Sequence, residues 1–206
     1  MAQISVVNIF SLSKAALLKF GALDWIADAV ADAIAKSESV GNRICGLYYL
    51  ESYCMQLQSG RVKGNVEPIV SKEKSGIVTV DAKFGFAQPA FNRGLGSACK
   101  AAFENGICSL VIGHAHTCTS LGYFTEKIAQ QNLIGIGFTN ASPIVAPPGG
   151  KSRIIGTLGS PKRCLILSSS SSCDLTSLSN VYLMLQSPNF IDDVLSCSSS
   201  TSLVLQ

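Results

Sequence analysis

The feature that most constrains the fold of this chain is an alternation of apolar runs with helical segments between residues 77 and 138. ICSLVIG (107–113) and LIGIGF (133–138) are nearly continuous apolar runs, which is typical of strands buried on both faces of a sheet. The helical segment before ICSLVIG stops at Asn105-Gly106, a favourable left-handed end. The order strand, helix, strand, helix, strand predicts an α/β core. We expect one sheet to contain residues 77–81, 107–113 and 133–138.

A strongly amphipathic helix is predicted ahead of this core, in ALDWIADAVADAIAKSE (22–38). Its spacing separates an apolar face from an acidic one. We expect the apolar face to point inward and the acidic face to point to solvent; the first holds Leu23, Ile26, Val30 and Ile34, and the second Asp24, Asp28 and Asp32. We assign residues 1–70 to an N-terminal helical segment and residues 71–157 to the α/β core.

The last segment, residues 158–206, differs in composition from the rest. It holds fourteen serines and five charged side chains, and no amphipathic period of useful length. Such a composition buries too little apolar surface to offset the entropy of ordering the chain. We therefore predict a serine-rich tail that is poorly ordered and lies outside the core.

Charge and cysteine usage limit the class of protein. The net charge is only +3, and no run of Lys or Arg indicates a nucleic-acid surface. The apolar runs are too short or too interrupted to span a bilayer. No leader sequence is apparent at the N-terminus. The eight cysteines lie at irregular spacings without a CxxC pair, which indicates free thiols in a reducing compartment. We expect a cytoplasmic protein that binds neither nucleic acid nor membranes.

Both histidines of the chain lie in HAHTCTSLGYF (114–124). In an extended strand His114, His116 and Cys118 point the same way, and imidazole and thiolate are ligands that zinc prefers. A clear fourth ligand is missing, and the ligand spacing is shorter than usual. No metal is therefore assigned, and three interpretations stay open: a metal site, a proton-transfer site and a plain loop between a strand and a helix.

Two other stretches contain residues typical of a nucleophile or of a dinucleotide-binding loop. Cys45 is either a nucleophile served by a distant histidine or a small buried apolar residue. RGLGSAC (93–99) lacks the third glycine of a dinucleotide-binding fingerprint and lies inside a helical pattern rather than at a strand-to-helix turn.

Several separated motifs resemble one enzyme family. VDAKFGFAQPAFNRG, then AHTCTSLGYFTEKIAQQNLIGIGFTNASPIVAPPGG, then IIGT occur in the order found in type-2 malate/L-lactate dehydrogenases. This family includes ureidoglycolate, diketogulonate and sulfolactate dehydrogenases. The segment ICGLYYLESYCMQLQSGRVKGNVEP is also similar to it. The resemblance covers residues 10–157.

The resemblance implies a fold and an activity. The implied fold is a helical segment followed by a mixed-sheet α/β core that is not a Rossmann fold. The implied reaction is hydride transfer between NAD or NADP and a small 2-hydroxy or 2-oxo acid such as malate, lactate or sulfolactate. Members usually act as homodimers.

The resemblance also implies catalytic positions. Members carry an acid/base histidine just before a Phe/Cys-Gly pair. Aligned by LGYF, that histidine falls on Thr117 and the glycine on Thr119, while His116 lies one residue earlier. His116 is the nearby side chain whose ordinary pKa suits proton transfer.

A second family motif, Ser-His-Gly with an arginine three residues after the glycine, also departs here. Its histidine corresponds to Cys45 and its arginine to Tyr49. The catalytic candidates are therefore His116, Thr117 and Cys45.

The cofactor candidates follow from the same resemblance and are Asn140, Ala141, Ser142, Gly149, Gly150 and Thr157. After Thr157 the family continues with Asn-Pro, whereas this chain has Leu158-Gly159. We interpret this break as truncation, with a shifted reading frame from about residue 158. The alternative to a working dehydrogenase is a catalytically inactive remnant, or a module that binds a metal or a partner.

Overall fold

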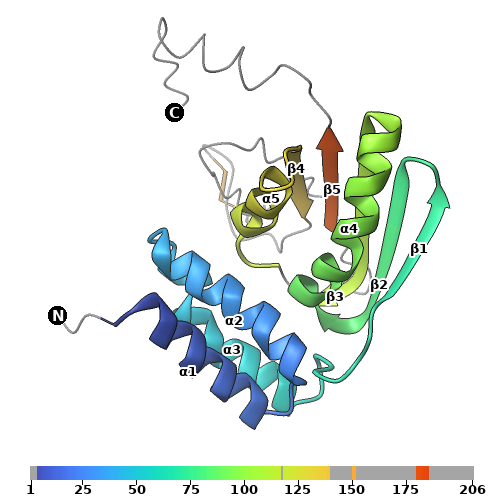
Figure 1. Ribbon diagram of the computed structural model, residues 1–206. Coiled ribbons are helices and arrows are strands. Elements are labelled where there is room, and N and C mark those ends of the chain that lie inside the picture. The colour runs from blue at the N-terminus through green and yellow to red at the C-terminus, as the bar shows by residue number, and fades with distance from the viewer. Residues whose placement is uncertain (1–3, 117, 140–149, 152–179, 186–206) are drawn as a thin grey trace, which may run out of the picture.

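The computed structural model describes residues 4–116, 118–139, 150–151 and 180–185. Three helices form an N-terminal layer, which packs against two further helices that cover a five-stranded sheet (Figure 1). Among the described residues, no helix is both long enough and apolar enough to cross a bilayer.

The N-terminal layer consists of α1 (Val6–Lys19), α2 (Asp24–Ser39), the short 3-10 helix η1 (Arg43–Cys45) and α3 (Leu47–Gln58). The inward face predicted for α2 is confirmed at Ile26, Val30 and Ile34, all buried. Leu23 is 45% exposed because it is the residue that precedes the first turn of the helix. Two of the acidic residues are bound by Lys14 of α1, whose Nζ lies 2.9 Å from Asp24 and 2.7 Å from Asp28.

The sheet has the strand order β1-β2-β3-β5-β4. Its strands are β1 (Ile69–Lys74), β2 (Ile77–Phe86), β3 (Ile107–His116), β4 (Ile134–Thr139) and β5 (Asn180–Leu185). β2 and β3 are parallel, whereas β1 pairs with β2, β3 with β5 and β5 with β4 in antiparallel fashion. The expectation that three apolar segments share one sheet is confirmed, and the sheet is mixed.

Two helices cover one face of this sheet, α4 (Ala87–Asn105) and α5 (Leu121–Ala129). Along β3 only alternate residues, among them Leu110 and Ile112, are fully buried, and Ser109 and Val111 between them are partly exposed. The expectation that β3 is buried on both faces is therefore wrong, because α4 and α5 pack on the same side.

The glycine pair of RGLGSAC lies within α4, away from any strand-to-helix turn. A Cβ at Gly94 would lie 2.6 Å from Val80 Cγ2 and 2.7 Å from Leu110 Cδ1, whereas a Cβ at Gly96 would meet nothing within 4 Å. Gly94 therefore allows α4 to approach β2 and β3 closely, which is a packing role.

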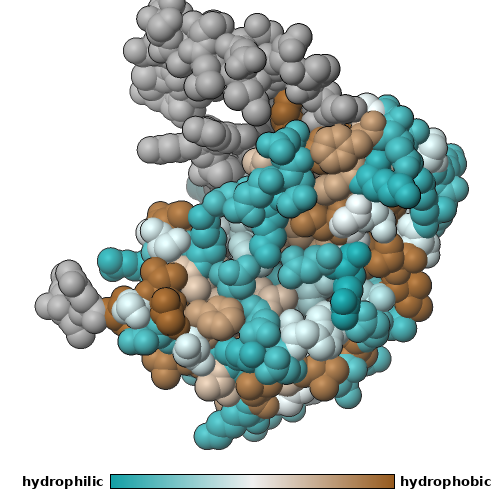
Figure 2. Space-filling model, viewed as in Figure 1, coloured by the Kyte–Doolittle hydropathy of each residue, from teal (hydrophilic) through white to brown (hydrophobic). Residues whose placement is uncertain are grey.

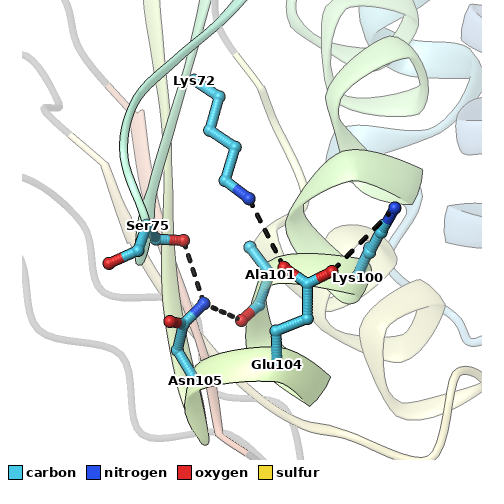
Figure 3. A network of polar contacts seen from close by, with 6 residues as sticks. All are labelled: Lys72, Ser75, Lys100, Ala101, Glu104 and Asn105. Atoms are coloured by element: carbon cyan, nitrogen blue, oxygen red, sulfur yellow. Dashed lines mark hydrogen bonds and ion pairs between the residues drawn. The ribbon is translucent and has the colours of Figure 1, made fainter.

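A polar network fixes the far end of α4 to the β1–β2 hairpin (Figure 3). Asn105 Nδ2 donates to the carbonyl oxygens of Ser75 (3.0 Å) and Ala101 (2.7 Å), and Lys72 Nζ lies 3.5 Å from the Glu104 carboxylate. The helix then ends at Gly106, whose φ of 77° is left-handed, as the Asn-Gly pair predicted.

Two strands were not predicted from the sequence. β1 is exposed along its whole length and carries charged residues, so it shows no apolar period. β5 lies within the segment 158–206 that was expected outside the core. For residues 180–185 that expectation is wrong, because they pair with β3 and β4 on either side and Met184 is fully buried. The remainder of 158–206 lies outside the described residues, and the division at residues 70 and 157 stays a prediction.

On the face shown in Figure 2, hydrophobic side chains form separate patches between hydrophilic ones. One patch adjoins the N-terminal residues, where Ile4, Val6 and Val7 are exposed. The core itself lies in two clusters, one between the sheet and α4–α5 and one among α1, α2 and α3.

Candidate active site

The candidate site lies where the parallel strands β2 and β3 end side by side. Phe86, the last residue of β2, is the register partner of His116, the last residue of β3. α4 begins immediately after Phe86, so its first turn stands next to His116. Three elements, β2, β3 and α4, thus converge at the carboxyl end of the sheet.

His116 is partly buried and packs against two aromatic rings. Tyr53 of α3 and Phe86 each present a ring edge-on to the imidazole, with ring centroids 5.8 Å away in both cases. Its Nδ1 atom is buried and has no hydrogen-bond partner among the described residues. Burial, and secondly the positive charge of Arg61, lower the pKa of His116 from 6.5 to about 4. The imidazole is therefore neutral at physiological pH.

This depressed pKa makes the stability of the fold sensitive to acid. The unfolded chain binds a proton at His116 below about pH 6.5, whereas the folded chain does so only near pH 4. Stability is therefore retained above pH 6.5 and lost as the pH falls toward 4, by about 3 kcal/mol for a shift of this size. Urea unfolding of the wild type and of His116→Phe at pH 7 and pH 4 measures this loss of stability. If the free energy of unfolding fell equally in both proteins on acidification, His116 would not be its cause.

A buried hydrogen-bonded chain supports the turn that follows His116. Tyr53 and Gln88 are 1% and 0% exposed. The Tyr53 hydroxyl lies 3.0 Å from Thr119 Oγ1, and Gln88 Nε2 donates to Tyr53 Oη (3.3 Å) and to the carbonyl of Cys118 (3.4 Å). Thr119 Oγ1 also donates to that carbonyl, at 2.6 Å. The backbone at residues 118–119 is thus held from α3 and α4 together.

Several non-glycine residues near the strand ends adopt positive φ values. They are Lys83 (50°), Phe84 (63°), His114 (48°) and Thr119 (59°). The register between β2 and β3 shifts between Asp81 and Gly85, so the strands are irregular here. Such conformations cost of order 1–3 kcal/mol each and cluster at functional sites.

His114 has surroundings different from those of His116. Its Nδ1 lies 3.1 Å from Asp81 Oδ1, its ring packs on Phe84 at 5.2 Å, and both partners of the ion pair are about half exposed. The left-handed backbone at His114 breaks the alternation that would direct His114, His116 and Cys118 to one side. Within the described part of the chain, no group of three or more His, Cys, Asp or Glu side chains is arranged to hold a metal.

Cys45 lies in η1 and is partly buried, and burial raises the pKa of its thiol. A raised pKa keeps the thiol protonated, which disfavours a nucleophilic role. The structure nevertheless brings Cys45 toward the loop after β3, since it contributes to raising the pKa of the buried Cys118 thiol to about 11, mainly an effect of burial.

The other predicted positions lie mostly outside the described residues. Thr117 falls there, as do the cofactor candidates Asn140, Ala141, Ser142, Gly149 and Thr157. Gly150 is described and exposed. These assignments stay predictions.

Three side chains of the site were not predicted from the sequence. Tyr53 and Gln88 lie within stretches that resemble the family, yet no periodicity marks them as polar members of a buried network. Arg61 is exposed, forms no ion pair among the described residues, and follows the left-handed Gly60 (φ 72°). Its neighbour Val62 packs into the cluster that contains Tyr53 and Phe86. Only tertiary packing shows that the positive charge of this arginine acts on His116.

The sequence and the fold were compared with those of known proteins. The family described as malate/L-lactate dehydrogenase matches residues 4–159, close to the extent of the resemblance in the sequence. The chain is 34% identical over 155 residues to the (2R)-3-sulfolactate dehydrogenase (NADP(+)) of Chromohalobacter salexigens, covering 75% of this chain and 46% of that protein. It is 28% identical over 154 residues to the Delta(1)-pyrroline-2-carboxylate/Delta(1)-piperideine-2-carboxylate reductase of Pseudomonas syringae pv. tomato, covering 75% and 45%.

Among solved structures, the malate dehydrogenase of Pyrococcus horikoshii superposes with a TM-score of 0.70 at 28% identity, covering 75% of this chain and 44% of that one. The chain thus spans a little under half the length of these curated relatives. Because the family match takes in all of α1 to β4 and the fold agrees with a solved relative, this chain belongs to the malate/L-lactate dehydrogenase family.

Proposed function

We propose that this chain carries the site that binds the acid substrate of an NAD(P)-dependent oxidoreductase. The enzyme interconverts a small 2-hydroxy acid and the corresponding 2-oxo acid. The observation that carries the proposal is a neutral imidazole that packs on Tyr53 and Phe86 at the carboxyl ends of two parallel strands, where the positive charge of Arg61 acts on it. The substrates named for the relatives, sulfolactate, malate and pyrroline-2-carboxylate, all contain a carboxylate. Arg61 supplies a cation for such a group.

The reaction needs one proton at the substrate oxygen. Reduction of a 2-oxo acid consumes a hydride and a proton, and oxidation of the 2-hydroxy acid releases both. A nicotinamide cofactor, when bound, would supply or accept the hydride. His116 exchanges the proton with the substrate oxygen. A carboxylate on Arg61 offsets the charge that disfavours the imidazolium, so substrate binding raises the pKa of His116 toward the range useful for acid/base catalysis.

The residues predicted for the cofactor follow β4 in the sequence: Asn140, Ala141, Ser142, Gly149, Gly150 and Thr157. Short polar side chains and backbone amides of glycines suit close approach to a dinucleotide. We propose NAD or NADP as the cofactor, a homodimer as the active form and the cytoplasm as the location. Since the chain spans under half of its relatives, the competing proposal is a catalytically inactive remnant.

A fluorescence titration of the purified chain with NADPH and NADH separates these two proposals. If the chain is a dehydrogenase, the fluorescence of NADPH or NADH should change and then saturate as the cofactor binds. The chain should also reduce pyruvate, oxaloacetate or sulfopyruvate. Absence of both binding and turnover supports the remnant and overturns the dehydrogenase.

Substitution of Arg61 tests the carboxylate site separately. Arg61→Gln is expected to raise the pKa of His116, because it removes a positive charge that disfavours the imidazolium, and to weaken binding of oxamate about tenfold or more, typical of a lost charge-assisted contact. Proton NMR follows the imidazole signals, since the chain has only two histidines.

Lys63→Gln is the matched control for Arg61→Gln. Lys63 lies two residues further along the same loop, with its Nζ over the ring of Phe84 at 5.7 Å. Lys63→Gln should leave the pKa of His116 near its wild-type value. Its affinity for oxamate should stay within about twofold of the wild-type affinity. Equal losses in both variants would show that general positive charge, rather than Arg61, attracts the carboxylate.

A further inference from the structure

We propose that Tyr53, supported by Gln88, is a positioning residue that holds Thr119 in a left-handed conformation and thereby fixes the backbone at residues 118 and 119, close to His116. The inference rests on the proposed role of His116, but its test needs neither cofactor nor turnover.

The conformation of Thr119 calls for such support. Its φ is 59°, and a β-branched residue is a genuine outlier in the left-handed region, at a cost of order 1–3 kcal/mol. Glycine adopts this region without that cost. The turn lies three residues after His116, between the end of β3 and the start of α5 at Leu121.

Hydrogen bonds link the turn at Thr119 to two buried side chains. Thr119 Oγ1 donates to the carbonyl of Cys118 at 2.6 Å. It also lies 3.0 Å from Tyr53 Oη, a contact in which either hydroxyl can be the donor. Gln88 Nε2 in turn donates to Tyr53 Oη at 3.3 Å. The turn is thus tied to Tyr53 directly and to Gln88 through Tyr53.

The same tyrosine also contacts the proton-transfer candidate. Its ring stands edge-on to His116 with centroids 5.8 Å apart, while its hydroxyl reaches Thr119. Because Tyr53 is 1% exposed and Gln88 is 0% exposed, water does not replace either hydrogen bond. Removal of the Tyr53 hydroxyl alone therefore keeps the contact between the ring and His116 and removes only the support of the turn at Thr119.

A double-mutant cycle tests this assignment. The variants are Tyr53→Phe, Thr119→Gly and the double variant, each measured by urea unfolding and by proton NMR titration of His116. Tyr53→Phe alone is expected to lower the folding equilibrium constant about tenfold, as loss of one buried hydrogen bond does. It is also expected to raise the pKa of His116 by about one unit, because a released turn admits water to the imidazole.

In the Thr119→Gly background both effects of Tyr53→Phe should shrink, to less than about threefold in the folding constant and less than half the pKa change, because glycine needs no support in this conformation. Gln88→Met serves as a second route to the same release and should raise the pKa of His116 in the same direction. Tyr49→Phe, on the same helix with its ring 5.1 Å from Tyr53, is the control and should leave that pKa near its wild-type value.

Two outcomes overturn the assignment. If Tyr53→Phe has the same effect with Thr119 and with Gly at position 119, the hydroxyl does not act through the turn. If the folding constant falls but the pKa of His116 stays at its wild-type value, Tyr53 is a structural residue only.

Discussion

Replacement of His116 by alanine is expected to lower turnover by about 10²–10⁴-fold with little change in cofactor affinity. The reason is that loss of a proton-transfer group acts mainly in the transition state. The measurement uses a chimera in which residues 1–157 of this chain are joined to the remaining half of the Chromohalobacter salexigens relative, which is 34% identical over the shared part. Steady-state reduction of sulfopyruvate by NADPH gives kcat and KM.

His114→Ala is the matched control in the same chimera. His114 is half exposed and bonded to Asp81 on the surface, so its removal should change turnover by less than about threefold, typical of a surface ion pair. Equal and small effects of the two substitutions would remove His116 from the proton-transfer role and move that role to Thr117, Cys45 or a bound water.

Substitution of Gly94 by valine is expected to destabilise the fold by about 3 kcal/mol or more, the upper range for overpacking. Even a Cβ at this position lies within 2.7 Å of Val80 and Leu110, and both of these side chains are fully or almost fully buried. Val80 is β-branched and has few alternative rotamers, so α4 must move away from the sheet. Equilibrium unfolding in urea measures the loss.

Gly96→Val provides the control within the same helix. A Cβ at Gly96 meets nothing within 4 Å, and valine has a somewhat higher helix propensity than glycine. Stability should therefore stay unchanged or rise by a few tenths of a kcal/mol. Similar losses at both glycines would mean that a β-branched side chain anywhere in this part of α4 lowers stability, so that close packing on β2 and β3 does not explain the effect at Gly94.

Much of the architecture follows from local sequence patterns. The 3.6-residue period of α2 places Ile26, Val30 and Ile34 inward because it depends only on the geometry of one helix. The end of α4 at Asn105-Gly106 follows from local backbone preferences. The pairing of β1 and the place of β5 between β3 and β4 did not follow, since they depend on backbone hydrogen bonds with residues distant in the chain.

The candidate site divides in the same way. The sequence identified His116 because it contains only two histidines and both lie beside a motif shared with the family. It did not identify Arg61, Tyr53 or Gln88, which come from a loop, α3 and α4. The depressed pKa of His116 arises from burial and from the charge of Arg61, and neither is a property of the local sequence.

The sequence by itself determined the family, the helical and strand segments that carry strong periods, and the position of the histidine pair. These features depend on residues close to one another in the chain, or on motifs in a fixed order. Tertiary structure alone decided that His116 is neutral, that His114 faces Asp81 instead, and that Tyr53 reaches Thr119. Burial and hydrogen bonding between distant segments produce these properties, so they exist only once α3, α4 and β3 have packed together.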